Sequence, residues 1–142
     1  MIFSLFTKKK RRKPVFKVGG MHHDLKDIYD QINADYFENK VNLPITWFGS
    51  RTSRPRARLT FGSYNPQSGL IKIHRLLDLP HVPRYFVSFI VYHEMLHHLL
   101  PPRKKKRRRE VHHQEFIERE RKFQEYSLAK EFRNLLVKEY FR

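Results

Sequence analysis

The run Tyr92-His-Glu-Met-Leu-His97 carries two histidines and a glutamate at a spacing typical of zinc-dependent hydrolases. Residues four apart lie on one face of a helix, so His93 and His97 can offer both imidazoles to a single ion. Glu94 lies about 100° further around the helix, where its carboxylate can reach a metal-bound water without ligating the metal. The spacing therefore predicts a zinc site with His93 and His97 as ligands and Glu94 as the catalytic general base.

The segment that carries this motif is predicted to be a helix from Arg84 to about Leu100. Pro83 suits the first turn, and Pro101-Pro102 ends the helix. Apolar side chains surround it on almost every side, which is typical of a buried helix. Histidine and glutamate in such a helix are costly unless they have partners, and a zinc ion with its water would supply them. The alternative is a chance match in a His-rich chain, with both imidazoles satisfied by the core.

A third zinc ligand is needed, because a catalytic zinc usually has three protein ligands and one open position. The chain has no cysteine, so this ligand must be histidine or a carboxylate. Arg103 occupies the place where metzincins keep a third histidine. The remaining candidates are Glu110, His112, His113 and Glu115. His112 and His113 are adjacent, so only one of them can point at the metal from a helix.

The other elements follow from periodicity and turn residues. Asp24 is predicted to cap a helix that runs to about Phe37, and Ile45–Phe48 reads as a strand. Residues 58–64 and 70–74 alternate around a turn cluster, which predicts an antiparallel hairpin. Helices are expected over 110–123 and from about 128 to 140. Helix, three strands, buried helix and further helices make one small α+β domain of 21–142.

Positive charge is concentrated in two runs, which account for most of the formal net charge of +16. The first lies in an arm, residues 1–20, expected to be flexible, and the second in a loop, residues 103–109. The runs are Lys8, Lys9, Lys10, Arg11, Arg12, Lys13 and Arg103, Lys104, Lys105, Lys106, Arg107, Arg108, Arg109. Such runs favour binding to polyanions, although solvated segments are the alternative. The loop lies between the second and third proposed ligands, so a polyanion held there would lie at the mouth of the site.

The remaining composition argues against several other classes. The absence of cysteine excludes disulfides and thiolate catalysis, and no apolar stretch approaches the roughly 20 residues of a membrane span. We therefore expect a soluble, cytoplasmic, nucleic-acid-associated protein with no integral membrane association. A membrane-surface anchor built from Ile2–Phe6 and the first basic run is a weaker alternative.

Residues 24–116 resemble the SprT-like zinc metallopeptidases, the group that includes the Spartan-type DNA–protein crosslink proteases. Asn33-Ala-Asp-Tyr-Phe37 is similar to the family's N-x-x-Y-F signature, and the hairpin followed by Leu77-Asp-Leu and Val82-Pro83 resembles the approach to its metal helix. His112-His-Gln-Glu-Phe116 resembles its H-G-x-E-F box, whose first histidine is the third ligand. The resemblance thus assigns that role to His112, with His113 in the glycine place. Two features depart from the family pattern: the loop before His112 has become an almost pure Lys/Arg run, and the last helix has no counterpart.

Together these observations predict a zincin-like domain with a three-stranded, mostly antiparallel sheet packed on helices. One Zn²⁺ is expected on His93, His97 and His112, and the expected reaction is peptide hydrolysis. By resemblance, the substrate is protein bound to or crosslinked with DNA, with arm and loop contacting phosphates. The main alternative is a nucleic-acid-binding module whose zinc is purely structural. Tyr64, Tyr85 and Tyr92 are candidate oxyanion partners, and Trp47 is expected in the core.

Overall fold

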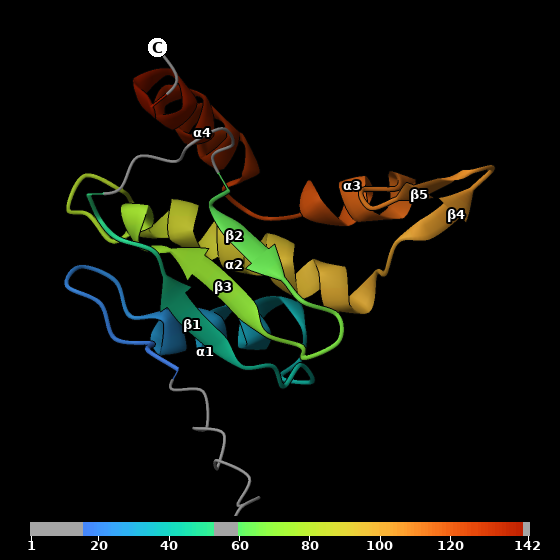
Figure 1. The fold of residues 1–142 in the computed structure, drawn as a ribbon, viewed down its shortest axis with the longest axis horizontal. Coiled ribbons are helices and arrows are strands. Elements are labelled where there is room, and N and C mark those ends of the chain that lie inside the picture. The colour runs from blue at the N-terminus through green and yellow to red at the C-terminus, as the bar shows by residue number, and fades with distance from the viewer. Residues whose placement is uncertain (1–15, 53–59, 141–142) are drawn as a thin grey trace, which may run out of the picture.

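A three-stranded sheet covered on one face by helices forms the body of the domain (Figure 1). The computed structural model describes residues 16–52 and 60–140. The helices are α1 (Leu25–Tyr36), α2 (Arg84–Leu99), α3 (Gln114–Glu120) and α4 (Tyr126–Tyr140), with a 3₁₀ turn at Arg75–Leu77. The strands are β1 (Ile45–Phe48), β2 (Gly62–Tyr64), β3 (Ile71–His74), β4 (Arg103–Lys105) and β5 (Arg108–Glu110).

The sheet has the order β1-β3-β2 and mixed pairing. β2 and β3 form the predicted antiparallel hairpin, but β3 runs parallel to β1, with Ile45 opposite Ile71 and Phe48 opposite His74. The sheet is therefore mixed rather than mostly antiparallel. The physical reason is the long connection between β1 and β2, which lets β3 take the central place that a short turn would have given to β2.

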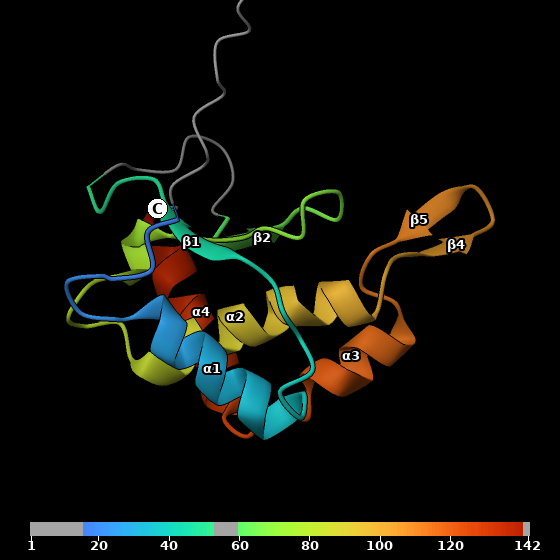
Figure 2. The same cartoon turned by 90° about the horizontal axis from the view of Figure 1, so that it is seen from below.

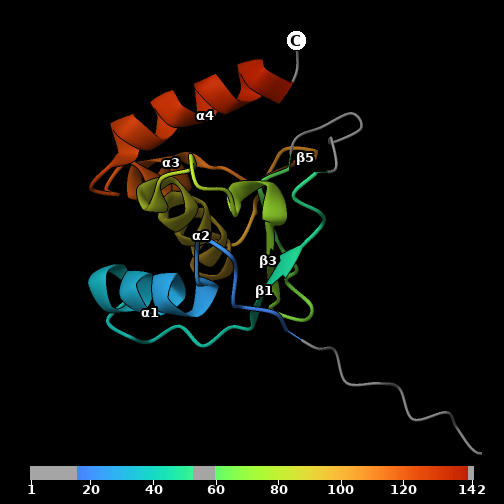
Figure 3. The same ribbon diagram turned by 90° about the vertical axis from the view of Figure 1, so that its left-hand side faces the viewer.

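The helix α2 is the centre of the core, and it packs against α1, α3, α4, β2 and β3. α1 and α2 lie on one face of the sheet (Figure 2), and α4 lies on the side of α2 opposite α1 (Figure 3). The predicted apolar surround of α2 is confirmed, since Phe86, Val87, Val91, Met95 and Leu96 are all fully buried. Trp47 is also buried, as expected.

Helix α1 begins and ends as the sequence indicates. The Asp24 side chain caps it by accepting hydrogen bonds from the backbone N–H groups of Lys26 and Asp27. Near its end, the Asn33 amide exchanges two hydrogen bonds with the backbone of Val41, at 2.7 and 3.2 Å. These bonds fold the chain back toward β1, which gives the Asn-x-x-Tyr-Phe signature a structural role.

Two predicted boundaries differ from the structure. The predicted loop 103–109 belongs to the β4–β5 hairpin, in which Lys106 takes the left-handed conformation of a turn residue (φ 55°). The helix predicted over 110–123 is consequently shorter, because Glu110 belongs to β5. Part of the expected arm is also docked: the Lys17 carbonyl accepts from the Trp47 N–H at 2.9 Å, and the Val18 carbonyl accepts from the Leu25 N–H at 2.9 Å.

The buried Asp78 carboxylate fixes the chain that leads into α1. It accepts hydrogen bonds from the backbone N–H groups of Met21, His22 and His23 at 2.9–3.0 Å, and it pairs with the Arg51 guanidinium. Burial by itself would raise the pKa of Asp78, but these donors lower it to about 2. Within the described part of the chain, no helix combines the length and apolar character that crossing a membrane requires.

We predict that Asp78→Asn lowers the free energy of unfolding by on the order of 2 kcal/mol at neutral pH. The folded-state pKa lies below that of the unfolded chain, so this stabilisation is complete above about pH 5 and is lost as the pH falls toward 2. Urea denaturation across that range measures it. The exposed Asp30, which pairs with Lys26, is the matched control, and Asp30→Asn should change stability by about 0.5 kcal/mol or less. Equal effects of the two variants would contradict the prediction.

Candidate metal centre

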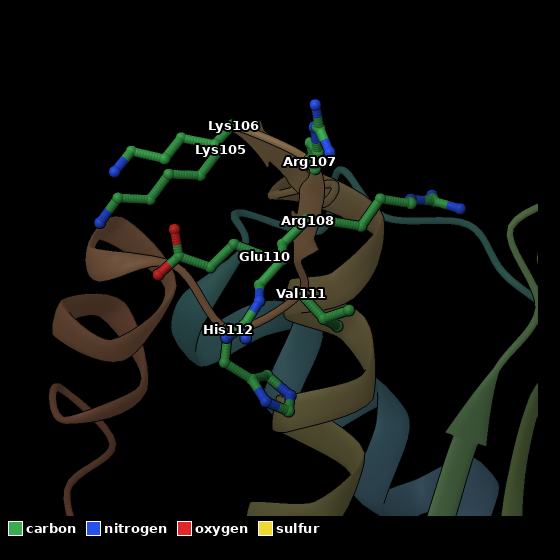
Figure 4. Close-up of a pocket in the computed structure, with 8 residues that line it drawn as sticks. Lys105, Lys106, Arg107, Arg108, Glu110, Val111 and His112 are labelled. Carbon is green, nitrogen blue, oxygen red and sulfur yellow. The ribbon is translucent and has the colours of Figure 1, made fainter.

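Three imidazole nitrogens converge at the C-terminal half of α2. His93 and His97 come from α2, and His112 comes from the segment between β5 and α3, at the base of the hairpin (Figure 4). Their Nε2 atoms form a triangle with sides of 3.1 Å (His93–His97), 3.2 Å (His93–His112) and 3.3 Å (His97–His112). The structure therefore brings together the three histidines that the sequence and the family resemblance nominated.

This triangle fits a zinc ion. Nitrogen ligands about 2.0–2.1 Å from a tetrahedral zinc lie about 3.3–3.4 Å apart, close to the distances seen here. His93, His97 and His112 would supply three ligands to the ion, and a fourth position would remain for a water or a substrate. Hydrogen bonds cannot satisfy all three contacts. Each Nε2 is either a donor or an acceptor, so at least two of the three atoms have the same role and cannot bond to each other.

The environment favours the neutral form of His97 and His112, which is the form that ligates a metal. Burial, together with the neighbouring His93 and His112, lowers the pKa of His97 to about 3. Burial and His93 also lower the pKa of His112, and the positive charges of Arg133 and Lys130 lower it further. A cation-binding site made of neutral donors is consistent with these shifts.

The second ring nitrogen of His93 has a carboxylate partner. Nδ1 of His93 lies 2.5 Å from Oε2 of Glu120, at the end of α3. Metal-ligating histidines usually donate this N–H to such a group, which fixes the tautomer and the ring orientation. Burial would raise the pKa of Glu120, but the hydrogen bond and charge of His93 lower it. Sequence reasoning missed Glu120, since no local spacing links it to a histidine 27 residues away.

The residues around His112 take structural positions. His113 is buried; its Nδ1 accepts from the Phe116 N–H and caps α3, and its Nε2 donates to the Pro101 carbonyl. The Phe116 ring packs against all three candidate ligands, with ring centroids 4.6–5.0 Å apart. The other candidates face elsewhere: Glu115 pairs with Arg103, which lies opposite Glu110 in the hairpin.

Glu94 lies beside the triangle at the wall of a cleft of about 390 Å³. Its side chain is only 6% exposed, and burial raises its pKa to about 7, against the opposing effect of His93. Such a carboxylate can take and return a proton near neutral pH, although a bound cation would lower this pKa. Gly62 lets β2 approach closely, since a Cβ there would lie 2.9 Å from Ile90 and 3.2 Å from Glu94.

The candidate oxyanion tyrosines occupy different places. Tyr64 lines the cleft, with its hydroxyl 2.8 Å from Nδ1 of His98. Tyr92 is 2% exposed and donates its hydroxyl to the Arg119 carbonyl, which ties α2 to α3. Tyr85 packs against Phe132 on the α4 side. Tyr64 is the only one of the three that lines this cleft.

The second basic run is exposed on the hairpin, directly before His112. Residues 105–112 line a pocket of about 860 Å³, and the cationic side chains extend away from the strands, with His112 below them (Figure 4). Like charges face each other across the strands, Lys104 opposite Arg109 and Lys105 opposite Arg108. The first run, Lys8–Lys13, lies outside the described residues.

No protein-family model matches this chain, and neither a curated protein nor a solved structure is significantly similar to it.

The triangle predicts that one zinc binds and that each of His93, His97 and His112 is required. Replacing any of them with Ala should abolish stoichiometric zinc, measured by atomic emission, because two imidazoles hold the ion too weakly. Glu115→Gln is the control and should keep stoichiometric zinc. It is preferred to His113→Ala, because the latter also removes the side-chain cap of α3. Full zinc in His112→Ala with loss in Glu115→Gln would show that the third ligand is wrongly assigned.

Proposed function

We propose that this chain is a zinc-dependent metallopeptidase. The observation that carries the proposal is the triangle of Nε2 atoms with the buried Glu94 beside it at the wall of an open cleft. Zinc, when bound, would lower the pKa of the water at its open position and polarise a substrate carbonyl. Hydrolysis of a peptide bond needs this Lewis acid together with a general base.

Glu94 is the group that moves the proton. Its carboxylate takes the proton from the attacking water and returns it to the leaving amine as the C–N bond breaks. His93, His97 and His112 hold the ion, and Glu120 keeps the His93 ring in the required orientation through Nδ1. The tightly packed Phe116 excludes water from the inner side of the ligands.

The edge strand supports a peptide as the substrate. β2 is at the edge of the sheet, lines the cleft and has no strand partner on its outer side among the described residues. An extended peptide can add to such an edge through main-chain hydrogen bonds, independently of its sequence. This would bring a backbone carbonyl toward the metal centre.

A structural zinc is the competing explanation, and the donor set argues against it. Structural zinc sites are closed by four protein ligands. Within residues 16–52 and 60–140, His93, His97 and His112 are the only group of three or more potential ligands close enough to share an ion. A water molecule or a substrate is left to complete the coordination.

We predict that Glu94→Gln keeps zinc and the fold but loses about 10²–10⁴-fold in proteolysis, because the amide cannot act as a general base. Cleavage of an unfolded protein substrate by the zinc-loaded protein measures this, and self-cleavage should be followed in parallel. Wild-type protein that carries zinc and cleaves nothing, with or without DNA, would favour the structural-zinc alternative.

The likeness to SprT-like peptidases supports a zincin-type domain whose substrates are DNA-bound or DNA-crosslinked proteins. The exposed basic hairpin supports the DNA part, because its opposed like charges destabilise the strand pairing and an anionic chain would relieve the repulsion. The hairpin leads directly into His112, so a phosphate chain bound to it lies beside the metal centre.

We predict that removing the hairpin charges abolishes stimulation of cleavage by DNA. The variant replaces residues 104–109 with Gln and keeps Arg103, which pairs with Glu115. Replacing Lys8–Lys13 with Gln removes the same charge and is the matched control. Both variants should flatten the salt dependence of binding, by about 0.7–0.9 in log–log slope per lost phosphate contact. Only the hairpin variant should lose stimulation at saturating DNA, and undiminished stimulation would show that the hairpin does not act on the site.

A further inference from the structure

A second cavity reaches the metal centre from the side of α4. It has a volume of about 440 Å³, and Phe61 and Ile90 form an apolar part of its wall. Glu94 and His112 line it where it meets the metal centre. Among residues 16–52 and 60–140, Arg133 is the one lysine or arginine whose side chain lines it. The cavity shares Glu94 and His112 with the larger cleft beside β2, so one extended ligand can lie in both.

The packing of α4 directs Arg133 toward this cavity. Ala129 and Leu136 are buried against the domain, and Arg133 lies four residues after the first and three before the second, on the same side of the helix. Its guanidinium carbon lies 6.0 Å from the centre of the Phe61 ring, within the range of a cation–π contact. Among residues 16–52 and 60–140, no carboxylate forms an ion pair with it.

The two sides of the metal centre therefore differ in charge. The cleft beside β2 is lined by neutral groups such as Tyr64, Pro101 and Pro102, and none of the described residues that line it is a lysine or arginine. On the other side, Arg133 lines the same cavity as Glu94 and His112. A ligand that spans both cavities therefore meets the positive charge of Arg133 at its α4 end.

We propose that Arg133 forms a subsite for a carboxylate of the peptide substrate, on the α4 side of the bond that is cleaved. A half-buried guanidinium without an acidic partner, next to apolar walls, is suited to a carboxylate held through two N–H donors. The carboxylate belongs either to an Asp or Glu side chain or to the free C-terminus. The inference rests on the proposed peptidase function only in taking a peptide as the ligand.

Cleavage of a mixture of short randomised peptides tests the subsite. With zinc-loaded wild-type protein, sequencing of the products should show Asp and Glu enriched at one position on one side of the cut. Arg133→Glu should replace this preference with Lys and Arg at the same position, because the charge of the subsite is reversed. Arg121 is exposed and lies outside both cavities, so Arg121→Glu should keep the wild-type preference. If only peptides with a free C-terminus are preferred, and the same peptides with an amidated C-terminus are not, the group bound is the terminal carboxylate.

Binding provides a readout that does not need catalysis. Immobilised, zinc-loaded Glu94→Gln protein should retain acidic peptides from the same mixture about 10-fold over their amide counterparts. The additional change Arg133→Gln should abolish this selectivity while zinc content stays the same. Selective retention of acidic peptides, with no cleavage by the wild-type protein, would contradict the peptidase function and still support the subsite. Cleavage or retention without acidic preference, a preference that survives Arg133→Gln, or no retention of any peptide would overturn the subsite.

Discussion

Three imidazole nitrogens lie within hydrogen-bond distance of one another, and the surrounding elements are arranged to hold them there. Their Nε2 atoms lie 3.1–3.3 Å apart, and hydrogen bonds can satisfy at most two of the three contacts. A cation satisfies all three lone pairs at once. Burial favours the neutral form of His97, which has no positive charge to repel the ion. The same burial holds the rings in place, because Phe116 packs against each of them.

The surrounding elements each position one part of this site. α2 supplies two ligands and the proposed base, α3 supplies Glu120, and β2 approaches closely enough at Gly62 to form one wall of the cleft. The hairpin and α4 both bring positive charge toward His112, one along an exposed surface and the other through Arg133 in a cavity. In the proposed peptidase, the hairpin would bind a nucleic acid and Arg133 would separately bind a carboxylate of the peptide.

Much of this arrangement could be predicted from local sequence. The spacing of His93 and His97 needs only a helix, and the cap, the prolines and the apolar surround defined the two central helices closely. The β2–β3 hairpin followed from its turn residues. Three further features depend on tertiary structure: the parallel pairing of β1 with β3, the contact between Glu120 and His93, and the approach of Arg133 to His112. A run of seven cations gave no periodic signal of a strand, so the hairpin was expected to be a loop.

Zinc K-edge X-ray absorption on the zinc-loaded protein can decide whether three histidines hold the ion and leave a position open, since it reports the number and kind of atoms bound to the ion. We expect zinc to be bound by three imidazole nitrogens and by one oxygen that is not from the protein. This oxygen should be displaced when a small hydroxamate is added. A shell of four protein ligands that hydroxamate leaves unchanged, or one with fewer than three imidazoles, would contradict this expectation.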